Sequence, residues 1–564
     1  VEAISKDEVV LQLLGITFPD GDFRYFHNNR LEPSAGGFYT IDPMSDDLNA
    51  DKILDALANV DGNTFFNWLR ETPVERELNP NLGEFYRRFA DLIDAYLKNR
   101  NRKLTQRQHE AIAGHYDKPL VLVQGPPGTG KSYTLAWAIL ARVAAAAVQG
   151  KPCRVLISCK THNAINVELQ ALAQALQQVS SFASDQFGGK GLRSLEIYKL
   201  VNDPGDPVAT GVSALNAFEQ KQNLEPILQK PFVVFGATSG GAYNLMKYRA
   251  LGGRNVDWTT KTFDLVVIDE ASQMSVPEGV LAGSFLKALG SMIVVGDHRQ
   301  MPPIIAHPWK DEKKRSATEH KPYVSLFETL VDRGFPQVKL DESFRLHEQI
   351  AEFLRANVYA KDGINFHSRR KEIINQLPPL QPYVDAVLDP HYPIVVIEHT
   401  EQASQQFNPV ELELTRPLID ACVKHLSLDG RNGIGVVVPH RAQKALLRAE
   451  FPNLAEVNSI DTVERFQGDE RDVIIVSATA SDPDYVRNEA DFLLNLNRMN
   501  VAISRPRKKL IVLASRSVVD LLTSDLEIFE QSAIWKRLFH HYTPDILIQS
   551  TMNGFKVSVR GRRI

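Results

Sequence analysis

A glycine-rich stretch of eight residues constrains the fold of this 564-residue chain more than any other part of its sequence. The stretch, GPPGTGKS, covers residues 125–132; it follows the apolar run PLVLVQ and opens the helical run YTLAWAILARVAAAAV. In such a strand–loop–helix setting, backbone N–H groups wrap a phosphate, a Lys reaches the neighbouring oxygens and a Ser ligates Mg²⁺. The sequence therefore predicts a nucleotide site that uses Lys131 and Ser132; the alternative is a glycine-rich structural turn.

Short β-branched runs recur along the chain, with helical stretches between them. The first block contains PLVLVQG, CRVLIS, PFVVFGA, FDLVVIDE and SMIVVGD, and the second contains PIVVIEH, GIGVVVP, DVIIVSA and LIVLAS. This alternation is typical of a parallel, doubly wound sheet. We predict an α/β fold with two similar parallel-sheet domains, and a chain of this length has room for roughly three to four compact units.

The domain boundaries follow from where this rhythm starts and stops. We expect an N-terminal accessory region over residues 1–101, a first domain over 102–335, a second over 336–548 and a basic C-terminal tail over 549–564. A segment of the first domain at about 168–230, rich in Ala, Gln, Leu and Ser, is predicted to be a helical insertion. The charged stretch at 309–321 is predicted to be a solvated loop.

Composition excludes several classes of protein. With 43% hydrophobic residues, 23% charged residues and a formal net charge of -4, the chain resembles an ordinary globular protein, and the charge argues neither for nor against nucleic acid. Three cysteines, Cys153, Cys159 and Cys422, exclude a disulfide framework and a four-cysteine metal site, and suit a reducing compartment. The longest apolar helical run is broken by Arg142 and is too short for a bilayer, so we expect no membrane partner. Because the chain lacks an initiator Met and a basic leader, we expect a cytoplasmic protein and a fragment of a longer chain.

A pair of carboxylates ends one of the predicted strands. In VVIDEASQ, Asp269 and Glu270 come directly after the apolar residues. The carboxyl edge of a parallel sheet is where ligands bind in such folds, so the pair is expected beside the phosphate loop. There Asp269 would hold Mg²⁺ and Glu270 would orient and deprotonate an attacking water. The alternative is a pair that only caps the strand end.

Four segments in this order, GPPGTGKS, DEASQ, GDHRQMPP and NRMNVAISRPRKK, resemble the motifs of superfamily 1 helicases. The resemblance is to the branch of the nonsense-mediated-decay RNA helicase and the replication helicase–nucleases, and it extends from about Leu104 to Ser515. It implies two tandem RecA-like domains with ATP and Mg²⁺ as cofactors. It also implies that hydrolysis between the domains drives 5′→3′ movement along single-stranded DNA or RNA. Residues 1–101, 168–230 and the part after about 516 carry no assigned motif.

The resemblance also implies which residues bind the nucleotide. Gln108, in LTQRQHEAI, would contact the adenine edge, although a Gln on an amphipathic helix is more often merely solvated. Where the family usually has Tyr-Arg, this chain has Phe344-Arg345 in LDESFRLHEQI, and a phenyl ring still stacks on adenine. The expected nucleotide-binding residues are Gln108, Gly125, Pro126, Pro127, Gly128, Thr129, Gly130, Lys131, Ser132, Tyr133, Phe344 and Glu470.

The catalytic set carried over from the family includes two arginines expected to act as fingers. An Arg from a second domain stabilises the charge that develops on the γ-phosphate, and Arg345 and Arg505 are the candidates. Gln300, in GDHRQMPP, would contact the γ-phosphate, and Asp297 would hold its loop. The expected catalytic residues are Lys131, Asp269, Glu270, Gln300, Arg345 and Arg505, with Ser132 and Asp269 as metal ligands. The alternative for Arg505 and Arg507 is local pairing with acidic residues such as Asp491.

Residues expected to contact the nucleic-acid strand carry a weaker signal. They are Thr161, His162 and Asn163 in KTHNAI, Thr238 and Ser239 in FGATSGG, and Pro302, Gln467 and Arg507. Small polar residues suit phosphate contact without base recognition, which movement along any sequence requires. Such loops are otherwise ordinary turns, and His162 is given no chemistry of its own. In the segment around Gln467, Glu464 stands where relatives often have Asp, so its role stays open.

Three functions remain compatible with these residues. The first is an ATP-dependent helicase or translocase, and the second is an ATP-switched nucleic-acid clamp that does not unwind. The third is a phosphate-loop kinase of small molecules, against which the second α/β block and the late arginines argue. Three cysteines exclude the cysteine-rich zinc domain of some relatives. A nuclease domain on an N-terminal part outside this sequence is a further expectation.

Overall fold

The computed structural model describes residues 49–71, 81–203, 206–249, 255–304 and 324–564, and four short strands within the first 48 residues. The first 48 residues are a compact unit of their own. In it β1 (Ala3–Ile4) pairs with β2 (Val9–Val10), and β3 (Gly15–Thr17) with β4 (Phe23–Tyr25), both antiparallel. The predicted loop at 309–321 lies outside the described residues.

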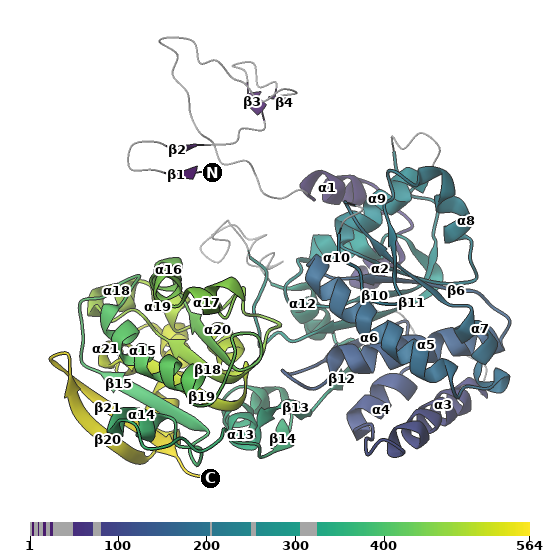
Figure 1. Ribbon diagram of the computed structural model, residues 1–564. Coiled ribbons are helices and arrows are strands. Elements are labelled where there is room, and N and C mark those ends of the chain that lie inside the picture. The colour runs from purple at the N-terminus through teal and green to yellow at the C-terminus, as the bar shows by residue number, and fades with distance from the viewer. Residues whose placement is uncertain are drawn as a thin grey trace. The chain divides into compact units, whose positions relative to one another are not determined.

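The first large sheet has eight parallel strands in the order β12-β5-β11-β10-β6-β9-β7-β8. Its strands are β5 (Leu120–Gln124), β6 (Cys153–Ser158), β7 (Glu196–Leu200), β8 (Ser213–Leu215), β9 (Phe232–Ala237), β10 (Phe263–Ile268), β11 (Leu286–Gly296) and β12 (Gln337–Lys339). Along β5, Val121 and Val123 enter the hydrophobic core on one face, whereas Leu120 and Leu122 enter the core on the other. Both faces are therefore covered by helices, as a parallel sheet requires (Figure 1).

Helices from distant parts of the sequence build these two cores. One face carries α3 (Asn81–Lys98), α4 (Gln106–Ala113), α5 (Lys131–Val148), α6 (His162–Ser180) and α7 (Gly189–Arg193). The other carries α1 (Ala50–Ala58), α2 (Thr64–Arg70), α8 (Leu224–Leu228), α9 (Ser239–Arg249), α10 (Val276–Gly283) and α12 (Leu326–Asp332). Because α1, α2 and α3 contribute to these cores, the second half of the predicted accessory region packs as part of the first domain.

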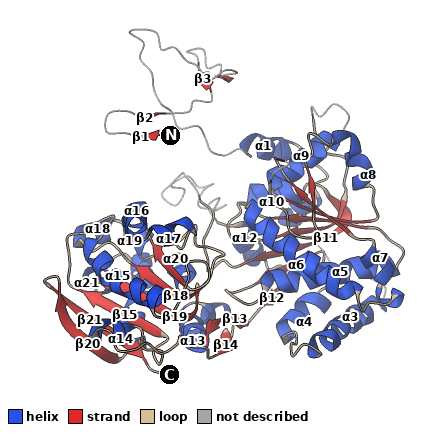
Figure 2. Cartoon of the chain, viewed as in Figure 1, coloured by secondary structure: helices blue, strands red, loops and turns tan. Residues whose placement is uncertain are grey.

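The segment predicted as a helical insertion differs from that prediction. It starts within α6 and continues with β7 and β8, which extend the first sheet beyond β9. Figure 2 shows the strands of the first sheet in red among blue helices. The strand run EIYKL mixes charged with apolar residues and SAL has only three residues, so neither has the β-branched pattern that identified the other strands.

The second large sheet has seven strands in the order β17-β16-β18-β19-β15-β21-β20. They are β15 (Ile394–His399), β16 (Ile434–Val438), β17 (Ile460–Thr462), β18 (Arg471–Ser477), β19 (Pro506–Ser515), β20 (Asp545–Met552) and β21 (Phe555–Arg562). The first five are parallel to one another, and β21 and β20 are added antiparallel. Two α/β units with parallel sheets, as the sequence predicts, are thus confirmed.

Helices again cover both faces of this second sheet. One core includes α13 (Glu348–Asn357), α18 (Pro483–Asn488), α19 (Ala490–Leu493), α20 (Leu496–Ile503), α21 (Arg516–Val519) and α22 (Leu526–Lys536). The other includes α14 (Pro382–Val387), α15 (Pro409–Lys424), α16 (Arg441–Glu450) and α17 (Pro452–Glu456). Between the two large sheets, β13 (Glu342–His347) and β14 (His367–Arg370) form a small parallel pair.

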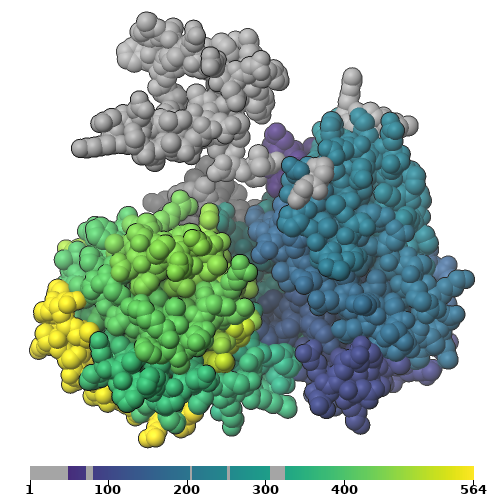
Figure 3. All heavy atoms as spheres, viewed as in Figure 1, coloured from purple at the N-terminus to yellow at the C-terminus, as the bar shows by residue number. Residues whose placement is uncertain are grey.

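Two predicted boundaries need correction. Residues 549–564 are not a tail, because they form the end of β20 and all of β21. Every residue of β15 is paired with a residue of β21. Figure 3 shows these C-terminal residues, in yellow, against the green residues of the same sheet. The first domain also continues past residue 335, because β12 pairs with β5.

Candidate functional site

The phosphate loop lies between β5 and α5 and depends on glycine. Gly128 and Gly130 have φ angles of +76° and +74°, a region that other residues rarely adopt. A Cβ added to Gly125 would lie 2.2 Å from Lys131 Cγ, so the loop closes tightly around this lysine. Lys131 Nζ donates to Gly125 O at 2.6 Å. Burial lowers the pKa of Lys131, and the carboxylates of Asp297 and Asp269 oppose that shift.

Asp269 and Glu270 follow β10, as predicted, and lie close enough to Lys131 to interact electrostatically. Burial raises the pKa of Asp269, and burial followed by the charge of Asp269 raises the pKa of Glu270 to about 7. In the described part of the chain, Asp269 Oδ1 and Glu270 Oε2 are buried without a hydrogen-bond partner. Orphaned carboxylate oxygens beside a phosphate loop fit a divalent cation and a water, because such groups are costly to bury unpaired.

A third carboxyl group joins this pair and was missed from the sequence. Glu168 on α6 is 2% exposed, and its side chain lies close enough to Ser132 and Asp269 for both to affect its pKa. Burial, followed by the charge of Asp269, raises the pKa of Glu168 well above its usual range. The sequence signal was a Glu beside Leu169 and near Ile165, on the apolar face of an amphipathic helix. Both predicted metal ligands are therefore connected to one buried acid.

The loop after β11 is held as expected, with additional partners. Gln300 Nε2 donates to Asp297 Oδ2 at 2.8 Å, which confirms that Asp297 holds the loop. Tyr359 donates its hydroxyl to the same Asp297 oxygen at 2.8 Å. Asn500 Nδ2, on α20, donates to Tyr359 Oη at 2.9 Å and to Arg299 O at 2.7 Å. A buried chain of contacts thus connects this loop to the helix that precedes Arg505.

β13 contacts the phosphate loop directly. Phe344 N donates to Gly128 O at 2.8 Å, and Ser343 Oγ donates to Pro127 O at 3.0 Å. A Cβ added to Gly128 would lie 2.5 Å from Arg345 Cβ, so glycine is needed for the approach as well as for the turn. Phe344 and Arg345, two of the residues predicted to meet the nucleotide from the second half of the chain, therefore lie on the phosphate loop.

The predicted arginine fingers lie within electrostatic range of Lys131, because both lower its pKa. Arg345 Nε is paired with a carboxylate oxygen of Glu470. Arg505 is 2% exposed and donates through Nε to Val501 O at 2.7 Å. Burial, followed by the charge of Arg345, lowers the pKa of Arg505 to about 9. The sequence-predicted cationic and anionic catalytic residues are thus gathered in one region.

A pocket of about 1230 Å³ opens beside the phosphate loop. Gln108, Gly130, Tyr133 and Phe344 line it, as the resemblance implies for an adenine site. Gln108 is buried, and its Nε2 donates to Thr129 O at 3.2 Å, so it is not a merely solvated residue. The pocket exceeds the roughly 300–1,000 Å³ of typical small-molecule sites and has room for a nucleoside.

The predicted strand contacts of the first domain lie where two helices begin. Thr161 is the N-cap of α6, accepting from Ala164 N at 3.2 Å, and Thr238 accepts from Gly241 N at 3.1 Å ahead of α9. His162, Asn163 and Pro302 are exposed, Gln467 is half-buried and Ser239 is buried. Helix N-termini attract phosphate, so the placement suits a backbone contact, which stays a prediction.

Arg507 is engaged within its own sheet. Its Nε donates to Asp472 Oδ1 at 2.7 Å and its Nη2 to Asn432 O at 2.6 Å, while Nη1 lies 3.6 Å from Glu470 Oε1. These contacts match the local pairing that the sequence left open as an alternative. Its role in strand binding stays a prediction.

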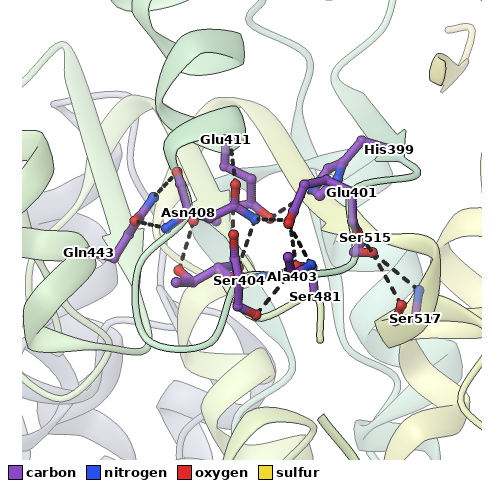
Figure 4. A network of polar contacts seen from close by, with 12 residues as sticks. His399, Glu401, Ala403, Ser404, Asn408, Glu411, Gln443, Ser481, Ser515 and Ser517 are labelled. Carbon is purple, nitrogen blue, oxygen red and sulfur yellow. Dashed lines mark hydrogen bonds and ion pairs between the residues drawn. The ribbon is translucent and has the colours of Figure 1, made fainter. Parts of the chain in front are cut away.

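A buried polar network lies at the carboxyl ends of β15 and β18 (Figure 4). His399 Nε2 lies 3.1 Å from Glu411 Oε1, and Thr479 N donates to Glu411 Oε2 at 3.1 Å. Asn408 Nδ2 donates to Glu401 Oε2 at 3.0 Å. Gln443, Ser404, Ser481 and Ser515 complete the network. The network fixes the start of α15 to the loops that follow β15 and β18, and no periodic pattern in the sequence predicted it.

Comparisons with known proteins find helicases. Two family models, each described as an AAA domain, match residues 108–306 and 323–517. The chain is 25% identical over 449 residues to the DNA replication ATP-dependent helicase/nuclease DNA2 of Xenopus laevis, covering 75% of this chain and 38% of that protein. It is 24% identical over 500 residues to the regulator of nonsense transcripts 1 of Dictyostelium discoideum, covering 82% and 34%. The chain belongs to the superfamily 1 helicases.

A third member of this helicase family, the ATP-dependent helicase NAM7 of Saccharomyces cerevisiae, is 24% identical over 495 residues, covering 81% of this chain and 45% of that protein. The chain thus spans less than half the length of these three relatives. In the described residues, no helix has both the length and the apolar character needed to cross a bilayer. The three cysteines are buried and free.

Proposed function

We propose that this superfamily 1 chain is an ATP-dependent helicase that moves along single-stranded nucleic acid. The observation that carries the proposal is the contact of β13 with the phosphate loop. It brings Arg345 to Gly128, and Arg345 and Arg505 both lie within electrostatic range of Lys131, which also interacts with Asp269 and Glu270. A small-molecule kinase has no need for arginines delivered from a second sheet.

Each residue has a defined part in hydrolysis. Ser132 and Asp269 would hold Mg²⁺, which when bound neutralises charge on the phosphates. Lys131 binds the transferred phosphate, and Glu270 orients the attacking water and takes its proton. Arg345 and Arg505 stabilise charge that develops during transfer. Gln108, Tyr133 and Phe344 bind the adenine, and Gln300 couples the phosphate to the strand-binding loops.

The test is hydrolysis of ATP with and without single strands. We expect single-stranded DNA or RNA to stimulate hydrolysis, and the comparison of the two also identifies the preferred nucleic acid. Glu270→Gln keeps the shape and Asp269 but removes the base, so it should bind ATP and hydrolyse it at least about 10²-fold more slowly. Full turnover by this variant, or no stimulation by either polymer, would contradict the proposal.

Direction of movement is part of the same proposal and rests on the family resemblance. A duplex with a 5′ single-stranded overhang should be unwound, and a matched duplex with a 3′ overhang should not. Unwinding from 3′ overhangs alone would reverse the assignment. ATP-dependent binding and stimulated hydrolysis without strand displacement would favour the second candidate, a nucleic-acid clamp.

The remaining expectations have less support. A cytoplasmic location fits three free, buried thiols, which suit a reducing compartment. The nuclease domain on a longer chain has no support among the described residues. The division of the chain into two RecA-like domains at β12–β13 is a proposal that follows from the sheet pairing.

A further inference from the structure

A second pocket, of about 210 Å³, lies beside the predicted strand contacts and shares no lining residue with the adenine pocket. His162 and Thr238 form one side of it, at the starts of α6 and α9. Its volume is below the roughly 300–1,000 Å³ of sites for drug-sized ligands, so the pocket suits a smaller, single-ring or double-ring group.

An exposed aromatic side chain also lines this pocket. Phe218 is 60% exposed, and its ring meets that of Tyr248 edge-on, with centroids 5.4 Å apart. Asn216 presents this ring: its Oδ1 accepts from Phe218 N at 3.0 Å and from Glu219 N at 3.1 Å, and its Nδ2 donates to Asn202 O at 2.9 Å. A turn fixed by three hydrogen bonds thus presents the ring of Phe218 to solvent, with Lys221 Nζ 5.4 Å from its centroid. An exposed aromatic ring is the usual platform for stacking a nucleobase.

Polar groups at the pocket provide hydrogen bonds for a base edge. Asn244 on α9 and Glu219 both line it, and neither side chain has a hydrogen-bond partner in the described part of the chain. None of the described lining residues is Lys or Arg, and Glu219 is acidic, so the pocket disfavours a phosphate. A carboxylate accepts from an exocyclic amino group, such as N4 of cytosine, and gains nothing from the O4 of thymine.

We propose that this pocket binds one nucleobase of the single strand and prefers a base with an exocyclic amino group. The base stacks on Phe218, Glu219 accepts from its amino group, and the adjoining phosphate lies at the helix starts by His162 and Thr238. The inference rests on the proposed function and adds base recognition to a track that the sequence predicted to ignore bases.

The test compares binding of labelled decamers of dC and dT by fluorescence anisotropy. The wild-type chain should bind the dC decamer more tightly than the dT decamer, because only cytosine offers an exocyclic amino group to Glu219. The two pyrimidines are alike in size, so size does not explain a preference. Phe218→Ala should weaken binding of dC by about 5- to 150-fold, which corresponds to the loss of one stacked base. Glu219→Gln should abolish the preference for dC, because a side-chain amide can accept from N4 of cytosine and can equally donate to O4 of thymine.

Phe529→Ala is the matched control. Phe529 is also exposed and also has a lysine over its ring at 5.4 Å, as Phe218 has Lys221, but it lies on α22 in the second sheet's helical layer. It should leave binding unchanged. An abasic decamer gives a second control, since Phe218→Ala should not affect it. Basal ATP hydrolysis should be unaffected in every variant because the two pockets are separate.

The outcomes separate this inference from the proposed function. A wild-type chain that binds no single strand overturns the proposed function and the base pocket with it. Two results would overturn the base pocket alone, provided that the wild-type chain binds single strands tightly. One is that Phe218→Ala binds the dC decamer as tightly as the wild type. The other is that Phe218→Ala weakens binding of the abasic decamer as much as binding of the dC decamer. Equal wild-type affinity for dC and dT overturns the preference for an amino group.

Discussion

Arg505 is a buried cation without a carboxylate partner among its hydrogen bonds in the described part of the chain. Its Nε donates to Val501 O at 2.7 Å, its Nη2 to Ser504 Oγ at 3.1 Å and its Nη1 to Asp469 O at 3.4 Å. Burial, and next the charge of Arg345, lowers the pKa of Arg505 to about 9. A buried guanidinium with only neutral partners is costly, and an anionic phosphate would compensate it.

Arg505→Ala should therefore impair hydrolysis more than nucleotide binding. The finger acts on charge that develops during transfer, so we expect hydrolysis to fall on the order of 10³-fold or more while ATP affinity changes by a small factor. Arg505→Lys should not restore activity, because an ammonium lacks the planar fork. Turnover and nucleotide affinity are measured on each variant.

Arg507→Ala is the control from the same strand. Its guanidinium is held by Asp472 and by Asn432 O, so its removal should keep most of the basal hydrolysis. Normal hydrolysis by Arg505→Ala together with a loss in Arg507→Ala would mean that the finger has been assigned to the wrong arginine.

At the residue scale the sequence predicted the groups that belong to contiguous motifs. Lys131, Asp269, Gln300 and Arg345 are found near one another. Lys131 and Asp269 follow strands with a recognisable apolar pattern, whereas Gln300 and Arg345 were implied by the resemblance to the helicase motifs. Glu168 was missed, because its importance depends on neighbours more than thirty residues away in the chain. Such a residue is visible only once the helix is packed.

At the scale of elements, strands with apolar runs were predictable and short or exposed ones were not. β20 and β21 were mistaken for a tail, although Asn553 and Gly554 between them have φ of 51° and 82°. An Asn-Gly pair with two positive φ values is the strongest short-range signal of a hairpin. The signal was present, but basic residues at the end of β21 hid the strand pattern.

Lys509 on β19 gives a pH-dependent prediction at this scale. Its buried Nζ donates to Asp389 O at 2.9 Å and Tyr392 O at 2.6 Å, fixing the turn ahead of β15. Burial lowers the pKa of Lys509 to about 7. Between pH 7 and about 10 the unfolded lysine carries a proton that the folded one has lost, so the free energy of unfolding should rise with pH.

The comparison of wild type with Lys509→Met isolates this effect. Their difference in free energy of unfolding should grow by up to about 1.4 kcal/mol per pH unit between pH 7.5 and 9.5. Urea unfolding followed by tryptophan fluorescence measures it, since Trp535 lies in the core of the same sheet. Lys508→Met, which removes a part-exposed pair with Asp472, should show no such slope. A difference independent of pH would contradict a lowered pKa.

At the scale of the whole chain, two parts that are far apart in sequence share a buried path. Asn500 on α20 donates to Arg299 O and to Tyr359 Oη, and Tyr359 in turn donates to Asp297. The path leads from the loop that holds Gln300 to the helix that ends just before Arg505. Because Asn500, Tyr359 and Asp297 are buried and joined by hydrogen bonds, we expect a shift at one end of the path to displace the other.

Asn500→Ala should therefore uncouple the loop that holds Gln300 from the helix that precedes Arg505. It removes two short bonds from buried acceptors, and each buried group left unsatisfied costs about 1–3 kcal/mol, so we expect hydrolysis to fall roughly tenfold to a hundredfold. ATP affinity should stay close to that of the wild type, because Asn500 does not line the adenine pocket. Tyr359→Phe removes the hydroxyl that connects Asn500 to Asp297 and should reproduce part of the loss.

Asn497→Ala is the matched control on the same helix, since its amide makes a single, longer bond of 3.3 Å to His298 O. Hydrolysis and its stimulation by single strands are compared across the three variants; equal losses in Asn500→Ala and Asn497→Ala would show that the helix is merely destabilised, and no loss in either would remove the path from the coupling mechanism.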